Sequence, residues 1–142
     1  MKFLAVVFVL ITFLDASITR KVNIEVVLDS KNNLMWVDDT SVIKLKKTHE
    51  DATAYCEDLI FAGYSNWRIP ELEEFETIVD KNNYKNYIKK GFKYNVPDGY
   101  WARKAHWRTL WFYADYMHFI SGTPYYDSRH KTKYVRCVRF IK

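Results

Sequence analysis

The first regular pattern along the chain is a pair of short apolar runs, Val26–Asp29 and Leu34–Val37, separated by the polar segment Ser30–Asn33. Two such runs on either side of a short polar segment are typical of a β-hairpin. Asn32 and Asn33 can both adopt the left-handed backbone conformation that such a turn requires. The pattern therefore predicts a hairpin here.

A helical pattern follows the hairpin. Thr48 and Asp51 have the spacing of a capping box, which marks the start of a helix. The apolar residues beyond them recur every three or four positions: Ala52, Tyr55, Cys56, Leu59 and Ile60. Gly63 is a residue type that commonly ends a helix. We predict a helix that begins after Thr48, ends near Gly63 and faces the core with these apolar residues.

A second helix is predicted to open at Pro70. The residue before a proline avoids the helical conformation, so Trp67–Ile69 is expected to be extended, whereas proline suits the first helical turn. Apolar residues then recur at helical spacing: Leu72, Phe75, Ile78 and Val79. The segment is also rich in glutamates, which are favourable at the positive end of the helix dipole. These are Glu71, Glu73, Glu74 and Glu76, and we expect them on a solvated face.

The carboxyl-terminal half favours strands. Asp80–Gly99 shows no sustained period and predicts a long loop with room for one helical turn. Strand-like runs follow at Tyr100–Arg103, Leu110–Phe119 and Tyr134–Ile141, with Gly122–Lys133 as a connection. Together these elements predict an α+β fold with a hairpin, two helices and a β-rich carboxyl half.

The amino terminus differs from the rest of the chain. Residues 3–14 form an apolar run that is shorter than the roughly 20 residues of a membrane span but suits a secretory signal peptide. We therefore expect residues 1–16 to be removed and residues 17–142 to form a single domain without a membrane span. An uncleaved anchor is the alternative, because Arg20 and Lys21 place positive charge just beyond the run.

Cys56 and Cys137 are the only cysteines. In an oxidising compartment they form one disulfide or remain two free buried thiols. A bridge would close a long loop, which stabilises a fold by about 4 to 5 kcal/mol in the chain-entropy account. The cysteines are far apart, and the four histidines are dispersed: His49, His106, His118 and His130. No metal site or other cofactor is predicted.

Four patches carry a resemblance to a known family. They are Asp29 with Leu34–Trp36, Ala52 with Tyr55–Cys56, Gly63 with Trp67–Pro70 and Glu74–Phe75, and Tyr100–Trp101 with Val135–Arg139. In these patches, over about residues 25–140, the chain resembles the Lcl C-terminal domain family. The family looks related to the C-type-lectin-like fold, which formylglycine-generating enzymes share. The resemblance implies that the termini meet in one sheet and that a disulfide links the Cys56 helix to the last strand.

Several patch residues are given structural roles. The tryptophans are expected in the core: Trp36, Trp67 and Trp101. Arg68 is expected to pair with a helix carboxylate such as Glu74 and so to fix the corner between strand and helix. Arg136 and Arg139 flank Cys137 on opposite faces of the last strand, so one is expected to serve the fold and the other to face solvent.

No catalytic constellation is evident in the sequence. The chain lacks a glycine-rich phosphate loop, a Gly-x-Ser-x-Gly elbow and the calcium-dependent sugar motifs of C-type lectins. An enzyme of the formylglycine-generating type would need a redox-active or metal-binding cysteine pair, whereas both cysteines match structural positions of the family. A non-catalytic role is therefore predicted.

Composition is that of a globular protein, with 49% hydrophobic and 27% charged residues, but 18% are aromatic. The net charge of +5 conceals a split, because residues 17–80 carry −6 and residues 81–142 carry +11. A basic, aromatic half is typical of a surface for an anionic partner. Arginine forks bind sulfate, phosphate or carboxylate, and flat rings stack on sugars. The predicted contact residues are Lys89, Lys90, Lys93, Arg103, Lys104, Trp107, Arg108, Tyr125, Tyr126, Arg129, Lys131 and Lys133.

The sequence thus predicts a non-catalytic binding or adhesion module, exported by a bacterium to the periplasm or the exterior. Its expected partner is an anionic glycan or an acidic protein surface. A structural subunit of an envelope complex and an enzyme of the formylglycine-generating type are the alternatives. The basic residues could also only neutralise the acidic helix face or keep the protein soluble. Nucleic acid suits the charges but is not expected as the natural partner of an exported protein.

Overall fold

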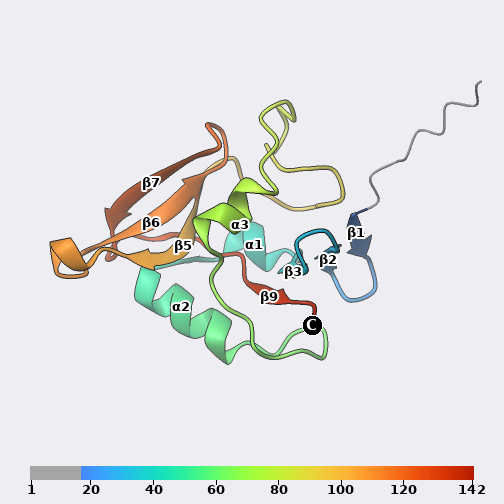
Figure 1. Ribbon diagram of the computed structural model, residues 1–142, viewed down its shortest axis with the longest axis horizontal. Coiled ribbons are helices and arrows are strands. Elements are labelled where there is room, and N and C mark those ends of the chain that lie inside the picture. Colours follow the sequence, from blue (N-terminus) through green and yellow to red (C-terminus); the bar gives the residue numbers. More distant parts are fainter. Residues whose placement is uncertain (1–16) are drawn as a thin grey trace, which may run out of the picture.

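The computed structural model describes residues 17–142, and the predicted signal peptide lies outside the described residues. The fold is α+β, rich in short strands and poor in helix (Figure 1). The strands are β1 (Ile18–Lys21), β2 (Val26–Asp29), β3 (Leu34–Val37), β4 (Lys46–Lys47), β5 (Gly99–Ala105), β6 (Tyr113–His118), β7 (Thr123–Ser128), β8 (Lys133–Tyr134) and β9 (Val138–Phe140). The helices are α1 (Ser41–Lys44), α2 (His49–Asp58), α3 (Leu72–Glu76) and a 3₁₀ turn, η1 (Trp107–Thr109). No helix in residues 17–142 has the length and apolar character to cross a membrane.

The first sheet has the order β1-β2-β3-β9, and all its neighbours are antiparallel. The predicted hairpin is present as β2 and β3. Asn33 takes the left-handed conformation, with φ of 56°. Asp29 closes the turn because its carboxylate accepts hydrogen bonds from the backbone N–H of Asn32 at 3.2 Å and from its side-chain amide at 2.7 Å. The first and last strands lie in one sheet, as the family resemblance implied.

The second sheet has the order β4-β8-β5-β6-β7. Its edge strand β7 was not predicted, because the segment was interpreted as a connection. The first four residues of β7 are all exposed, so the strand lacks the apolar and polar alternation by which strands are recognised. The predicted strand from Tyr134 to Ile141 is divided. β8 belongs to this sheet and β9 to the first, so Val135–Cys137 crosses between the two sheets.

Helix α2 begins as predicted, since the Thr48 hydroxyl accepts a hydrogen bond from the Asp51 backbone N–H at 3.3 Å. It ends at Asp58, however, well before Gly63, because Leu59 is already extended. Ile60 was expected to face the core, but it lies beyond the helix and is 80% exposed. Gly63 instead occupies a turn, with φ of 79°.

Helix α3 is short, and Pro70 precedes it instead of forming its first residue. Glu71 is the N-cap residue, and Glu71 and Glu74 form a reciprocal capping box. The ion pair expected at this corner is present: Arg68 Nη1 and Nη2 donate to the two carboxylate oxygens of Glu74 at 2.6 and 2.8 Å. Phe75 is fully buried on the inner face of the helix. The following loop runs to Gly99 without a helix.

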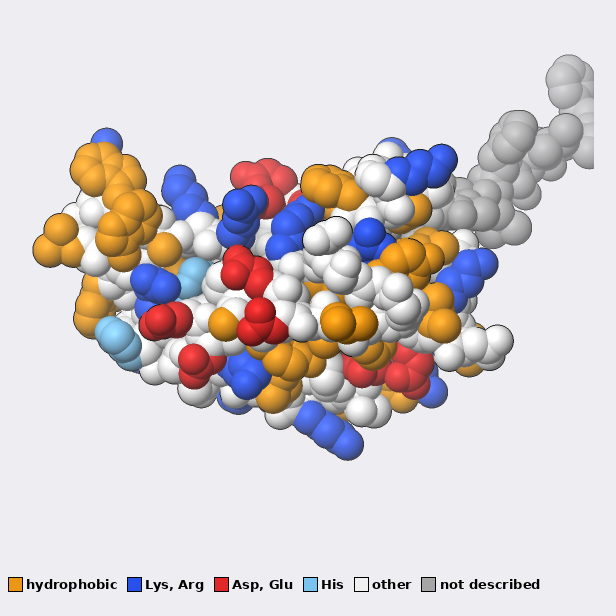
Figure 2. Space-filling model, turned by 90° about the horizontal axis from the view of Figure 1, so that it is seen from below, with side chains coloured by type: hydrophobic (Ala, Val, Ile, Leu, Met, Phe, Trp, Pro, Cys, Tyr) orange, Lys and Arg blue, Asp and Glu red, His pale blue; other side chains and the backbone are white. Residues whose placement is uncertain are grey.

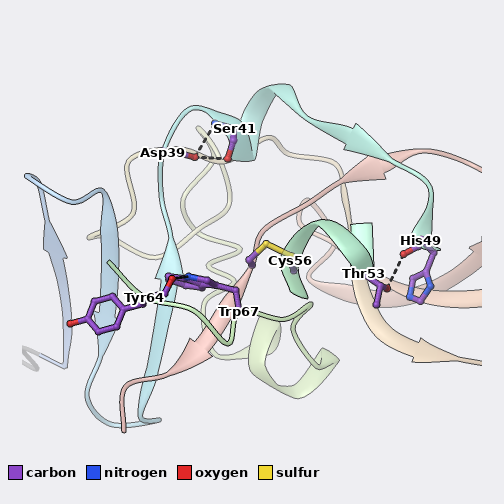
Figure 3. Close-up of a disulfide and its surroundings, with 8 residues drawn as sticks. Asp39, Ser41, His49, Thr53, Cys56, Tyr64 and Trp67 are labelled. Carbon is purple, nitrogen blue, oxygen red and sulfur yellow. Dashed lines mark hydrogen bonds between the residues drawn. A yellow bond between two sulfur atoms is a disulfide. The ribbon is translucent and has the colours of Figure 1, made fainter. Parts of the chain in front are cut away.

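Two neighbouring apolar clusters form the core, and the motif tryptophans lie in them as expected: Trp36, Trp67 and Trp101. The Cys56–Cys137 disulfide joins α2 to the segment that leads into β9, with a Cα–Cα distance of 5.5 Å (Figure 3). Arg136 is fully buried and serves the fold. The expectation that the other arginine faces solvent was wrong in part: Arg139 is half-buried, its Nε and Nη1 atoms are buried, and its guanidinium lies 4.5 Å from the centre of the Tyr64 ring.

Candidate anion-binding site

The turn between β5 and β6 carries the candidate site. It lies at one end of the long axis of the domain, opposite β1 (Figure 1). After η1, Leu110 and Trp111 adopt left-handed backbone conformations, with φ of 54° and 63°. Such a conformation costs about 1–2 kcal/mol for a residue other than glycine. Surrounding contacts must therefore hold the turn in place.

Two residues supply those contacts. The Thr109 hydroxyl donates to the His106 carbonyl at 2.8 Å and accepts from the Tyr113 backbone N–H at 3.3 Å. Arg129, after β7, donates its Nη1 to the Trp111 carbonyl at 3.2 Å and its backbone N–H to the Phe112 carbonyl at 2.9 Å. The shape of the turn is thus fixed both from within and from the neighbouring chain segment.

A cavity of about 320 Å³ opens on one side of this turn, lined by Lys104, His106, Trp107 and Arg108. Neither Lys104 nor Arg108 forms an ion pair within residues 17–142. The Arg108 guanidinium lies 5.5 Å from the centre of the Trp107 ring, and Trp107 is 63% exposed. The cavity thus offers two cations and a flat apolar face to a ligand.

His106 also lines the cavity, and its imidazole contacts residues of two strands. Its Nε2 lies 2.5 Å from Oδ1 of Asp115, which is buried in β6. Its ring lies 5.6 Å from that of Tyr126 on β7. Strand residues therefore position the imidazole, and Tyr126 extends the aromatic surface beside the cavity.

A larger cavity, of about 440 Å³, lies beside the turn between β1 and β2, and its lining includes Val22, Ile24, Leu28 and Met35. One of its two cations, Arg20, is committed to the fold, because its Nε donates to Asp38 Oδ2 at 2.6 Å. This cavity therefore offers less to an anion than the one at the β5–β6 turn.

The predicted contact residues do not form one surface. Lys104, Trp107 and Arg108 line the cavity, and Tyr126 lies beside it. Lys89, Lys90 and Lys93 belong to the loop before β5, which packs near β1 at the other end of the domain (Figure 1). Other predicted residues have partners within the fold. Arg103 pairs with Glu71 at 2.9 Å, Arg129 braces the β5–β6 turn, and Tyr125 stacks on Tyr116.

Lys131 and Lys133 are both engaged by Asp127, at 3.2 and 3.0 Å. Burial alone would raise the pKa of Asp127, but hydrogen bonds from Lys133, the Ser128 backbone N–H and Lys131 outweigh it, so the pKa is lowered. The Lys133 ammonium also lies 3.9 Å from the centre of the Tyr116 ring, and its side chain is only 14% exposed. Lys133 thus acts mainly within the fold.

Comparison with known protein families gives a match over most of the chain. The model of the Lcl C-terminal domain family covers residues 25–139, from just before β2 into β9. The chain belongs to this family. The match confirms the resemblance drawn from the sequence patches, and the cavity at the β5–β6 turn lies inside it. No curated protein matches the chain.

Sequence reasoning missed part of the site in this Lcl C-terminal domain. His106 was noted only as an isolated histidine, and Leu110–Phe112 was assigned to a strand. The turn contains no glycine, proline or asparagine, the residues that usually mark a turn. Its one weak signal is Thr109, a residue type that forms local side-chain hydrogen bonds to the backbone.

Proposed function

We propose that this Lcl C-terminal domain is a non-catalytic binding module that recognises an anionic glycan, or a similar anionic ligand of an envelope or host surface. The observation that carries the proposal is the cavity where Lys104, Arg108 and the exposed Trp107 face one space. The Arg108 fork suits sulfate or carboxylate, and Lys104 adds a second charge. The Trp107 indole supplies a flat face for a sugar ring.

We also propose that the domain has a C-type-lectin-like fold and acts in the periplasm or outside the cell. The shared sheet of β1 and β9 and the disulfide beside it support the fold assignment. The disulfide also supports export, because such bonds persist in oxidising compartments. On this proposal residues 1–16 are a signal peptide and residues 17–142 are the mature domain.

The Cys56–Cys137 disulfide also favours a binding module over an enzyme of the formylglycine-generating type. That chemistry needs a reactive cysteine, and the disulfide engages both cysteines of the chain. Thiol labelling of the exported, unreduced protein tests this part. We expect labelling only after reduction, and a reactive thiol in the native protein would favour the enzyme.

Retention of the exported protein on a sulfated-polysaccharide column in a salt gradient tests the site. The Lys104→Ala/Arg108→Ala variant should elute much earlier, because a hydrogen bond to a charged group is worth about tenfold in affinity. The matched control is Lys89→Ala/Lys90→Ala, which removes the same charge from exposed residues of the loop near β1. Equal shifts for both variants would mean that only net charge is sensed, and the proposal would fail.

The Trp107→Ala variant separates sugar recognition from charge. The substitution leaves the net charge unchanged, so simple ion exchange predicts no shift in elution. Stacking of a sugar on the indole predicts earlier elution. The column result should agree with a direct binding titration against a sulfated oligosaccharide.

A further inference from the structure

The same turn presents an apolar surface that extends beyond the proposed glycan cavity and shares Trp107 with it. We call it the β5–β6 tip: Trp107, Leu110, Trp111 and Phe112. These four residues lie within a segment of six and are 63%, 89%, 55% and 46% exposed. In Figure 2 hydrophobic side chains gather at the end of the molecule that bears this turn, with Lys and Arg side chains beside them. An apolar projection of this kind in a soluble domain marks an interaction site.

The tip is built to point outward. Leu110 and Trp111 hold their left-handed backbone, while Arg129 binds the carbonyls of Trp111 and Phe112. The Phe112 ring packs edge-on against Tyr113 and His130, at 5.1 and 5.5 Å between ring centres. These contacts keep the most exposed residue, Leu110, at the end of the projection. Backbone strain that neighbouring contacts maintain in this way is typical of functional sites.

Basic residues flank the tip. Lys104 and Arg108 line one cavity together with Trp107. A second cavity, of about 270 Å³, is lined by Leu110, Trp111 and Phe112 of the tip and by Arg129 and His130. The acidic residue among the lining side chains is Glu50. The charge at this end of the domain is therefore complementary to an anionic surface.

The shape of the tip indicates the kind of surface. A small ligand is usually enclosed by concave walls, whereas the tip residues are 46% to 89% exposed. A bilayer interface accepts tryptophan at the level of the headgroups and aliphatic side chains just below it. Lysine and arginine beside such residues contact anionic headgroups. The tip offers each of these parts: Leu110 is its most exposed residue, two tryptophans lie beside it in the chain, and basic residues line the adjoining cavities.

We propose that the β5–β6 tip inserts into the interface of a lipid bilayer that contains anionic lipids. Leu110 and Trp111 enter the interface, Trp107 and Phe112 lie at its edge, and Arg108 contacts the headgroups. The tip lies at the opposite end of the domain from β1 (Figure 1), so β1 is directed away from the bound bilayer. Trp107 and Arg108 also belong to the proposed glycan site, whereas Leu110, Trp111 and Phe112 do not line that cavity, so substitutions at these three residues separate the two proposals.

Co-sedimentation of the exported protein with vesicles tests the proposal. We expect binding to mixed phosphatidylglycerol and phosphatidylcholine vesicles and much weaker binding to phosphatidylcholine alone. The Leu110→Asn/Trp111→Asn variant should bind at least about tenfold more weakly, because two apolar side chains no longer leave water. Asparagine tolerates the left-handed backbone, so the turn should keep its shape. The matched control is Val22→Asn/Ile60→Asn, which removes two exposed apolar side chains elsewhere.

Tryptophan fluorescence gives a second readout. Vesicles should shift the emission to shorter wavelength, and the Trp111→Phe variant should lose most of that shift. Absence of binding to anionic vesicles, or an equal loss in the control variant, would overturn the proposal. So would self-association that the tip substitutions abolish without any vesicle binding, since the partner would then be a second copy of the chain. The tip variant should keep its retention on the sulfated column, so failure here leaves the glycan site standing.

Discussion

Asp38 and Arg136 form an ion pair in which neither side chain is exposed to solvent. Arg136 Nη1 lies 3.2 Å from Asp38 Oδ1, and Arg20 donates to the other carboxylate oxygen. The carboxylate also accepts the backbone N–H groups of Lys93 and Tyr94, at 2.9 and 3.2 Å. Asp38 therefore joins the end of β3 to the crossing between the sheets and to the loop before β5.

Removing this carboxylate should destabilise the domain strongly. We expect Asp38→Ala to lower the free energy of unfolding in urea by about 3–5 kcal/mol, because the buried Arg136 is left without its counter-charge. Arg103→Ala breaks an exposed ion pair and should cost less than about 1 kcal/mol. Similar losses of unfolding free energy in the two variants would show that the buried ion pair stabilises the domain no more than the exposed one. Hydrogen exchange at the amides of Lys93 and Tyr94 should also accelerate in Asp38→Ala.

The disulfide should contribute a comparable amount. It closes a loop across a sequence separation of 81 residues. In the chain-entropy account a loop of this length stabilises the fold by about 4.5 kcal/mol. The Cys56→Ala/Cys137→Ala variant should therefore unfold at lower urea concentration, and the reduced parent protein should match it. A loss below about 1 kcal/mol would mean that the crosslink constrains the unfolded chain little.

The elements that sequence predicts well here are those with local signals. The β2–β3 hairpin has its polar turn between two apolar runs, and Thr48 caps α2 through a contact three residues away. Strand β7 was missed because an exposed edge strand needs no apolar alternation. The end of α2 was misplaced because Leu59 leaves the helix although its spacing continues the apolar stripe.

The candidate site was predicted only in part, for a related reason. Charge could be counted from the sequence, but the partner of each charge depends on the fold. Lys133 belongs to a basic run, yet in the fold it pairs with Asp127 and lies over the Tyr116 ring. Lys104 and Arg108 have no carboxylate partner among residues 17–142, and only the β5–β6 turn brings them to one cavity.

Stability should fall in mild acid through His49. Burial lowers the pKa of this imidazole. Its Nε2 lies 2.9 Å from the Ala102 carbonyl and its Nδ1 accepts from Arg129 Nε at 3.3 Å, so the neutral ring with its proton on Nε2 satisfies both contacts. The unfolded histidine titrates near pH 6.5 and binds a proton before the folded one does. The neutral His49 ring therefore makes its full contribution to the free energy of unfolding above about pH 6.5. That contribution is lost as the pH falls through the pKa of the folded state.

Unfolding in urea at pH 7.5 and pH 5.0 measures this effect. The parent protein should lose more stability between the two values than His49→Gln, which can still donate to Ala102 but does not titrate. Equal losses would assign the pH dependence to other groups. Comparing the two proteins removes the shared contributions of the other histidines.

Relief of backbone strain in the β5–β6 tip should raise stability. Leu110 holds a left-handed backbone with φ of 54° and is 89% exposed, so its side chain gains little from the fold. Leu110→Gly removes a strain of about 1–2 kcal/mol and adds about 0.5–1 kcal/mol of backbone entropy cost, which predicts a gain of about 0.5–1 kcal/mol. Ile60→Gly, at an exposed site without positive φ, should give no gain. If Leu110→Gly raises the unfolding midpoint and weakens vesicle binding, the strained leucine serves contact with the bilayer and not folding. A loss of stability would instead show that the leucine supports the turn.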